Sequence, residues 1–168
     1  MIIPYLLLRE KSMNKYYTGV GSRSTPSHIL EVMTQLAKKL AGEGWTLRSG
    51  GALGADTAFE VGADSVGGSK EIYRPSQANR RALDMAAAIH PAWHKCSHFA
   101  KQLHARNCFQ VLGINLDTPS SFLVCWTLGG ADIGGTRTAI VLARNNNIEV
   151  LNLGLVEQLN RITQYLQQ

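Results

Sequence analysis

Three glycine-rich loops, each placed between a strand-like run and a helix-like pattern, constrain the fold of this 168-residue chain most strongly. The central loop, residues 49–56, reads Ser-Gly-Gly-Ala-Leu-Gly-Ala-Asp and follows the apolar run at 45–47. The other two loops cover residues 19–26 and 129–138. In an open α/β sheet, loops of this kind gather at the carboxyl ends of the strands, where ligands bind. The sequence therefore predicts one site built from all three loops.

Strand-like runs alternate with helix-like patterns along the chain, which is typical of βαβ units and a parallel sheet. Strands are expected at residues 15–20, 45–48, 71–73, 122–126 and 148–151. The predicted fold is a Rossmann-like, doubly wound α/β sheet of about five strands in the order 3-2-1-4-5. A helical excursion at residues 75–112 is expected between strands 3 and 4. Residues 15–168 are predicted to form a single domain, and residues 1–14 an N-terminal extension or an extra edge strand.

The composition is that of an ordered globular protein, because 45% of the residues are hydrophobic and 17% are charged. A net charge of +5 favours anionic partners such as nucleotides, other phosphate-containing small molecules or single-stranded DNA. The three cysteines include no C-x-x-C pair, which predicts reduced thiols and a cytoplasmic location. The apolar N-terminus is too short to span a bilayer and lacks signal-peptide features, so we expect no membrane association.

Histidines and cysteines are concentrated between residues 90 and 108, which raises the question of a metal site. Their spacing matches neither a zinc finger nor a zinc ribbon, both of which need paired ligands on two arms. We therefore expect no metal site and no bound cofactor. The residues concerned are His90, His94, Cys96, His98, His104 and Cys108.

The glycine loops are predicted to bind phosphate. Glycine permits φ > 0 and lets a ligand approach the backbone closely, and a helix start offers free N–H groups to an anion. The alternative interpretation is that the loops are tight turns whose small residues serve packing alone. The loop residues expected to bind the ligand are Gly19, Gly21, Ser22, Ser49, Gly50, Gly51, Ala52, Gly54, Gly134, Gly135 and Thr136.

Four arginines and one tryptophan are expected to contact the same ligand. Arg23 and Arg137 belong to the glycine loops, while Arg74 and Arg106 lie at loop edges or helix ends. A guanidinium group binds phosphate through two parallel hydrogen bonds, although an arginine can equally be a solvated surface group. Trp126 ends a predicted strand ahead of the third loop, where it can stack on a base or pack in the core.

Asp56 and Glu60 stand one helical turn apart, so both are predicted to project from one face of the helix that follows the central loop. A carboxylate at the helix start competes with phosphate for the same N–H groups. Asp56 is therefore expected to face a ribose hydroxyl or to tie down a neighbouring loop. The pair can also stabilise an oxocarbenium-like transition state, which makes both residues candidates for glycosidic cleavage. The alternative is a solvated acidic helix start.

The loop sequences resemble the SLOG superfamily, a Rossmann-like group that includes the DNA-processing protein DprA/Smf and the LOG phosphoribohydrolases. The DprA-like members are the most similar, through a Ser-Gly-Gly-Ala-x-Gly-x-Asp loop matched here by residues 49–56. The resemblance covers roughly residues 15–152 and extends to single-domain members encoded by bacteriophages and bacteria. It implies single-stranded DNA binding in recombination or DNA processing, and a homo-oligomer.

Three hypotheses for function follow. The first is binding of a nucleotide or nucleotide-derived phosphate, such as a NAD-derived or cyclic nucleotide signal, by a sensor or sequestering protein. The second is DprA-like binding of single-stranded DNA, and the third is hydrolysis of a nucleotide N-glycosidic bond. The LOG enzymes carry a catalytic glutamate in the motif Pro-Gly-Gly-x-Gly-Thr-x-x-Glu, whereas Gly-Gly-Thr at 134–136 is followed here by Arg-Thr-Ala. Binding without catalysis therefore ranks above hydrolysis.

Overall fold

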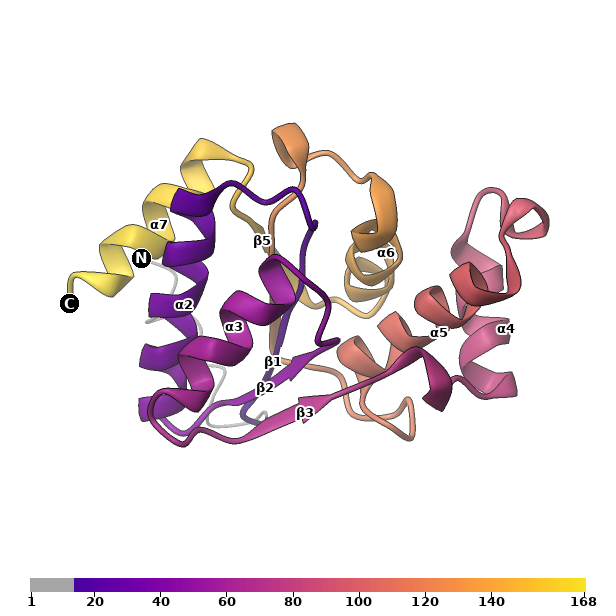
Figure 1. Cartoon of the computed structure of the whole chain (residues 1–168), viewed down its shortest axis with the longest axis horizontal. Coiled ribbons are helices and arrows are strands. Elements are labelled where there is room, and N and C mark those ends of the chain that lie inside the picture. Colours follow the sequence, from indigo (N-terminus) through magenta and orange to yellow (C-terminus); the bar gives the residue numbers. More distant parts are fainter. Residues whose placement is uncertain (1–13) are drawn as a thin grey trace.

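The protein is a three-layer α/β structure around a parallel sheet (Figure 1). The structure is a computed structural model that describes residues 14–168, so the predicted extension at 1–14 lies outside the described residues except for its last one. The five strands run in the order β3-β2-β1-β4-β5 and all pair in parallel, which confirms the predicted fold. They are β1 (Tyr16–Gly19), β2 (Thr46–Ser49), β3 (Lys70–Ile72), β4 (Phe122–Cys125) and β5 (Glu149–Asn152).

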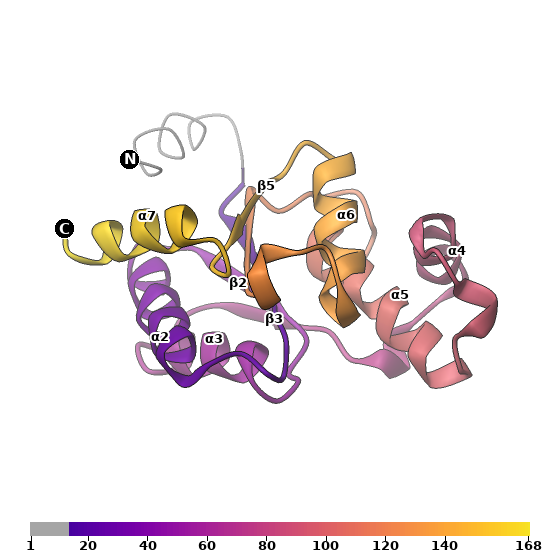
Figure 2. The ribbon, with the colours of Figure 1, turned by 90° about the horizontal axis from the view of Figure 1, so that it is seen from above.

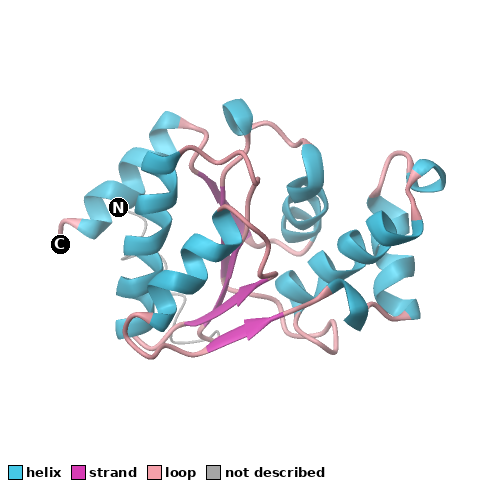
Figure 3. Cartoon of the chain, in the orientation of Figure 1, coloured by secondary structure: helices cyan, strands magenta, loops and turns pink. Residues whose placement is uncertain are grey.

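Helices cover both faces of the sheet, as a doubly wound fold requires (Figures 1 and 2). One face is covered by α2 (Ser27–Gly42), α3 (Ala55–Asp64) and α7 (Val156–Leu166). The other is covered by α5 (His98–Leu112) and α6 (Arg137–Asn145), with α4 (Arg80–Ile89) packed on α5. Figure 3 shows that the strands are short and that loops make up much of the edge where the strands end.

The predicted helical excursion between strands 3 and 4 consists of two parts. Residues 75–95 form η1 (Pro75–Gln77), α4 and η2 (Trp93–Lys95), and α4 lies beyond α5 at the end of the molecule away from α7 (Figure 1). The second part, α5, is the crossover helix itself, because it packs on the sheet and continues into β4. One wall at the carboxyl edge of the sheet therefore comes from the excursion.

The core on the α2/α3/α7 face is built around aromatic side chains of the central strands. Tyr17 stacks on Phe122 with 5.5 Å between ring centroids, and Trp45 meets Phe122 edge-on at 5.1 Å. The Tyr17 hydroxyl is buried and finds no hydrogen-bond partner among residues 14–168. Helices α2 and α3 approach closely at Gly62, where a Cβ atom would lie 2.2 Å from the carbonyl oxygen of Thr34.

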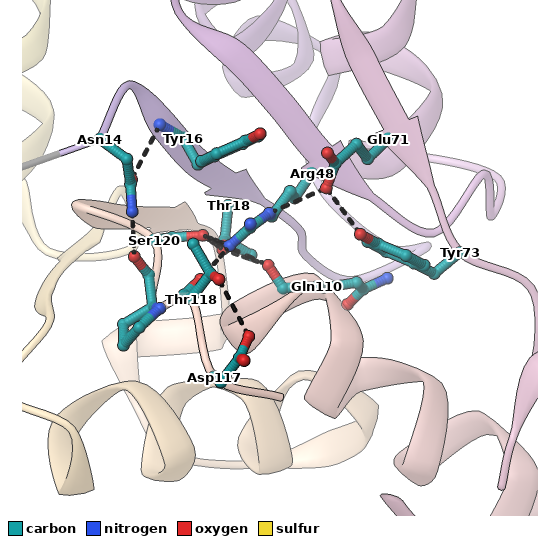
Figure 4. Close-up of polar contacts among 11 residues, drawn as sticks. Asn14, Tyr16, Thr18, Arg48, Glu71, Tyr73, Gln110, Asp117, Thr118 and Ser120 are labelled. Atoms are coloured by element: carbon teal, nitrogen blue, oxygen red, sulfur yellow. Dashed lines mark hydrogen bonds and ion pairs between the residues drawn. The ribbon is translucent and has the colours of Figure 1, made fainter. Parts of the chain in front are cut away.

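A buried arginine on β2 links β3 to the loop that precedes β4 (Figure 4). Arg48 is 2% exposed, and its Nε donates to Glu71 at 3.1 Å. Its guanidinium also donates to the backbone of Thr118 and to the hydroxyl of Ser120, and it lies over the ring of Tyr16. With its donors used in this way, Arg48 is a structural residue of the sheet.

Candidate functional site

The three glycine loops meet at one cavity of about 790 Å³, at the carboxyl ends of β1, β2 and β4. It lies where the strand order reverses between β1 and β4, the usual position of a ligand in an open α/β sheet. The first loop contributes residues 20–24 and 26, the second Ala52 and Asp56, and the third residues 133–136, with residues 126–128 directly before it. Helix α5 forms the opposite wall.

The first two loops pack directly on one another, and glycine is what allows this. A Cβ atom on Gly54 would lie 2.9 Å from the Cα of Arg23, and Gly54 has a φ of +88° that other residues rarely adopt. A Cβ atom on Gly21 would lie 2.7 Å from that of Ala55. These two glycines therefore fulfil the packing role of the alternative interpretation, and they bring Arg23 to the cavity wall.

Helix α5 holds the central and third loops through a polar face. The Nη1 atom of Arg106 donates to the carbonyl oxygens of Gly50 at 2.8 Å and Tyr73 at 3.2 Å. The side-chain amide of Asn107 donates to the carbonyl oxygen of Gly135 at 2.9 Å. When the side-chain amide of Gln110 is oriented so that its oxygen and its nitrogen both have hydrogen-bond partners, the oxygen accepts the N–H of Gly50 at 3.0 Å. These bonds fix the backbone of two loops from the α5 side of the cavity.

Asp56 is the acidic residue of the cavity wall, and it is only 4% exposed. Its Oδ2 atom accepts the N–H of Ala52 at 3.3 Å. Burial raises the pKa of Asp56 to about 6, although the Arg106 guanidinium and the amides of Ala52 and Gly50 act to lower it. Burial also lowers the pKa of Arg106, which still carries its charge at neutral pH. The site therefore combines a fixed cation with a carboxyl group that titrates near neutrality.

Ten of the predicted residues line the cavity, and they come from all three loops and α5. Because Arg23 and Trp126 are among them, the wall holds a cation and an aromatic ring. The ten are Gly21, Ser22, Arg23, Ala52, Asp56, Arg106, Trp126, Gly134, Gly135 and Thr136.

The remaining predicted residues do not line the cavity, and most have packing roles. Gly19 lies against the ring of Phe59, and Ser49 donates its hydroxyl to the carbonyl oxygen of Gly19 at 2.6 Å. Gly50, Gly51 and Gly54 shape the central loop, and Arg74 lies beside Gly51. The other two are charged residues with partners elsewhere.

Glu60 and Arg137 are these two charged residues, and each contacts another part of the chain. The carboxylate of Glu60 accepts a hydrogen bond from Nζ of Lys70 at 2.7 Å, at the start of β3. Arg137 donates to the carbonyl oxygen of Ile89 at the end of α4, at 3.0 Å. Of the predicted carboxylate pair, Asp56 alone belongs to the cavity wall.

The α5 wall is the part of the site that the sequence reasoning missed, apart from Arg106. Ala100, Leu103, Asn107 and Gln110 recur at helical spacing and all line the cavity, together with His104. Asn107 and Gln110 are polar residues in a helix end whose other residues are mostly apolar, which is a signal of a polar site facing the helix. Two apolar residues in or directly before the third loop, Leu128 and Ile133, were also missed.

No protein-family model, curated protein or solved structure matches the chain. Within residues 14–168, none of the helices combines the length and the apolar character that crossing a bilayer requires.

Proposed function

We propose that the protein binds a nucleotide or nucleotide-derived phosphate in the cavity, as a sensor or sequestering protein. The observation that carries this proposal is the meeting of three glycine loops at the reversal point of the strand order, where α/β sheets bind such ligands. The cavity volume of about 790 Å³ is within the range of small-molecule and cofactor sites.

The chemistry of the wall suits a ligand with an anionic end and a flat apolar end. Arg23 offers a guanidinium group for phosphate. Trp126, Leu128 and Ile133 offer apolar surface for a base. Asp56, when ionised, is an acceptor for a ribose hydroxyl, and when protonated it can donate to a phosphate oxygen.

A thermal-shift screen tests the proposal with nucleoside mono-, di- and triphosphates, NAD derivatives and cyclic nucleotides. A ligand at 100 times its Kd stabilises the folded state by about 2.7 kcal/mol. Arg23→Ala is expected to weaken the binding of any hit, because it removes a phosphate partner from the wall. Arg80→Ala is the matched control, since Arg80 is exposed on α4 and pairs with Asp84. The proposal fails if no member of the panel stabilises the protein, or if both variants bind a hit like the wild type.

Hydrolysis of an N-glycosidic bond is the second candidate, and it is favoured by the position and pKa of Asp56. A buried carboxyl group with a pKa near 6 is suited to general acid or base catalysis at neutral pH. Asp56→Asn is then expected to abolish base release while nucleotide affinity persists. Glu60→Gln is the control, because Glu60 pairs with Lys70 outside the cavity. Wild-type protein that binds a nucleotide and releases no free base after long incubation is a binding protein only.

A further inference from the structure

Two histidines and a cysteine from three separate elements converge beside the cavity. His90 follows the last turn of α4, Cys96 follows η2, and His104 lies in α5. One ligand atom of each lies within 4.8 Å of the others, and all three residues are half-buried. We propose that His90, Cys96 and His104 bind one divalent metal ion of the zinc type. This inference does not rest on the proposed nucleotide site.

The spacing of the side chains is close to what a tetrahedral ion needs. The Sγ atom of Cys96 is 3.7 Å from Nε2 of His90, and the rings of His90 and His104 are 4.6 Å apart at their centroids. With bonds of about 2.0 to 2.3 Å, the ligand atoms of a tetrahedral zinc ion lie roughly 3.5 Å apart. Small side-chain rotations therefore bring the three ligand atoms around one ion.

His104 is already oriented for this role by a partner on α6. Its Nδ1 atom is 2.8 Å from the hydroxyl oxygen of Thr138, which is buried. When Nδ1–H donates to this hydroxyl, the lone pair of Nε2 is left for a metal. Outer partners of this kind fix the ring and the tautomer of metal-binding histidines.

His90 must exchange one interaction to bind the ion. Its Nδ1 atom accepts the N–H of Ala92 at 3.0 Å, so a neutral ring carries its proton on Nε2. Coordination through either nitrogen therefore releases the Ala92 amide from the ring. Cys96 in turn binds as a thiolate and loses its proton to solvent.

The donor set selects the class of metal. Two imidazoles and one thiolate suit zinc, cobalt and copper, whereas magnesium and calcium prefer oxygen ligands. Three protein ligands leave one tetrahedral position open for water or another ligand. Because His104 also lines the cavity, the ion would lie at the cavity wall. The sequence spacing does not reveal this site, because His90 and His104 are 14 residues apart. Cys96 lies near both of them only because the chain turns at η2.

Titration of untagged protein with Co²⁺ tests the site directly. We expect one equivalent to give the visible bands of tetrahedral cobalt together with a thiolate-to-cobalt charge-transfer band. Cys96→Ser is expected to lose the charge-transfer band, and His104→Gln to weaken binding by more than about 100-fold, beyond the loss of an outer partner. His94→Gln and His98→Gln are the controls, because both residues are exposed and outside the cluster. Circular dichroism of each variant shows whether it is folded.

Two further measurements distinguish a specific metal site from nonspecific metal binding. Thr138→Val, which removes the outer partner of His104, is expected to weaken Co²⁺ binding by about 10- to 100-fold. The amide resonance of Ala92 is expected to shift when Zn²⁺ is added to labelled wild-type protein. The proposal is overturned if one equivalent of Co²⁺ gives no tetrahedral spectrum, if Cys96→Ser keeps the charge-transfer band, or if Ala92 is unmoved by Zn²⁺.

Discussion

Asp56 and Arg106 hold the same glycine loop through opposite backbone groups. The Asp56 carboxylate accepts the N–H of Ala52, and the Arg106 guanidinium donates to the carbonyl oxygen of Gly50. Each charge acts on the other: burial raises the pKa of Asp56 and the Arg106 charge partly offsets that rise, while burial lowers the pKa of Arg106 and the Asp56 charge partly offsets that fall. The charge state of one carboxyl group is thereby tied to the loop that forms the cavity wall.

The first prediction is that Asp56 makes the fold less stable as the pH rises. Its pKa rises from 3.8 to about 6 on folding, which corresponds to roughly 3 kcal/mol. The unfolded chain releases this proton first, so the contribution is fully present below pH 3.8 and is lost as the pH rises through 6. Urea unfolding of the wild type and Asp56→Asn between pH 4 and 7 measures the difference. Curves that stay parallel across this range contradict the prediction.

The second prediction is that Arg106→Lys destabilises the protein by about 2 to 3 kcal/mol, since hydrogen bonds from charged donors contribute about that much. A lysine cannot reproduce the planar guanidinium, whose Nη1 donates to Gly50 and Tyr73 while its Nε donates to the side chain of Asn107. Arg137→Lys is the matched control, and we expect a loss below about 1 kcal/mol, because one backbone contact is within the capacity of a lysine ammonium as well. Equal losses in chemical denaturation would show that the planar guanidinium has no special role.

The third prediction concerns two glycines with opposite surroundings. Gly54→Ala is expected to cost about 2 kcal/mol or more, because Gly54 has a φ of +88° and lies against the backbone of Arg23. Gly42→Ala is expected to stabilise the protein by up to about 1 kcal/mol, since Gly42 ends α2 and a Cβ atom there meets open space. Thermal unfolding of the two variants should therefore shift in opposite directions.

The fourth prediction is that Tyr17→Phe raises the free energy of unfolding by about 1 kcal/mol. The hydroxyl is buried without a hydrogen-bond partner among the described residues, and removing it relieves that desolvation cost. The stacking of the ring on Phe122 is retained. A matched change is Tyr73→Phe, which should be destabilising because the Tyr73 hydroxyl donates to Glu71 at 2.6 Å. A loss of stability in Tyr17→Phe would indicate that the hydroxyl is satisfied by water.

The strand order could be predicted because it depends on local signals. Each glycine loop follows an apolar run and precedes a helical pattern, and parallel strands place such loops at one edge. The role of Asp56 followed in part from the same logic, because a carboxylate at a helix start competes with phosphate for N–H groups. The structure places its carboxylate on the amide of Ala52, within the central loop itself.

The contacts made by long side chains could not be predicted in this way. Glu60 shares a helix with Asp56, yet its direction is decided by Lys70 on β3. Arg137 follows the third loop, yet its guanidinium reaches the end of α4. The α5 wall was missed because its contacts with the glycine loops join residues more than 25 positions apart, such as Asn107 and Gly135. Periodicity reports which face of a helix is buried, and it does not report what that face meets.

The division of the cavity between loops and α5 has an evolutionary consequence. The loop wall is bound to the strand ends, where the glycines at 21 and 54 have no room for a side chain. The α5 wall includes Ala100 and Leu103, whose side chains face the cavity from a helix. Substitutions at these two positions leave the turns of the sheet untouched. One wall of the pocket is thus held by close packing, while part of the other can accept substitutions, so that new ligand preferences can arise by changing a helix surface alone.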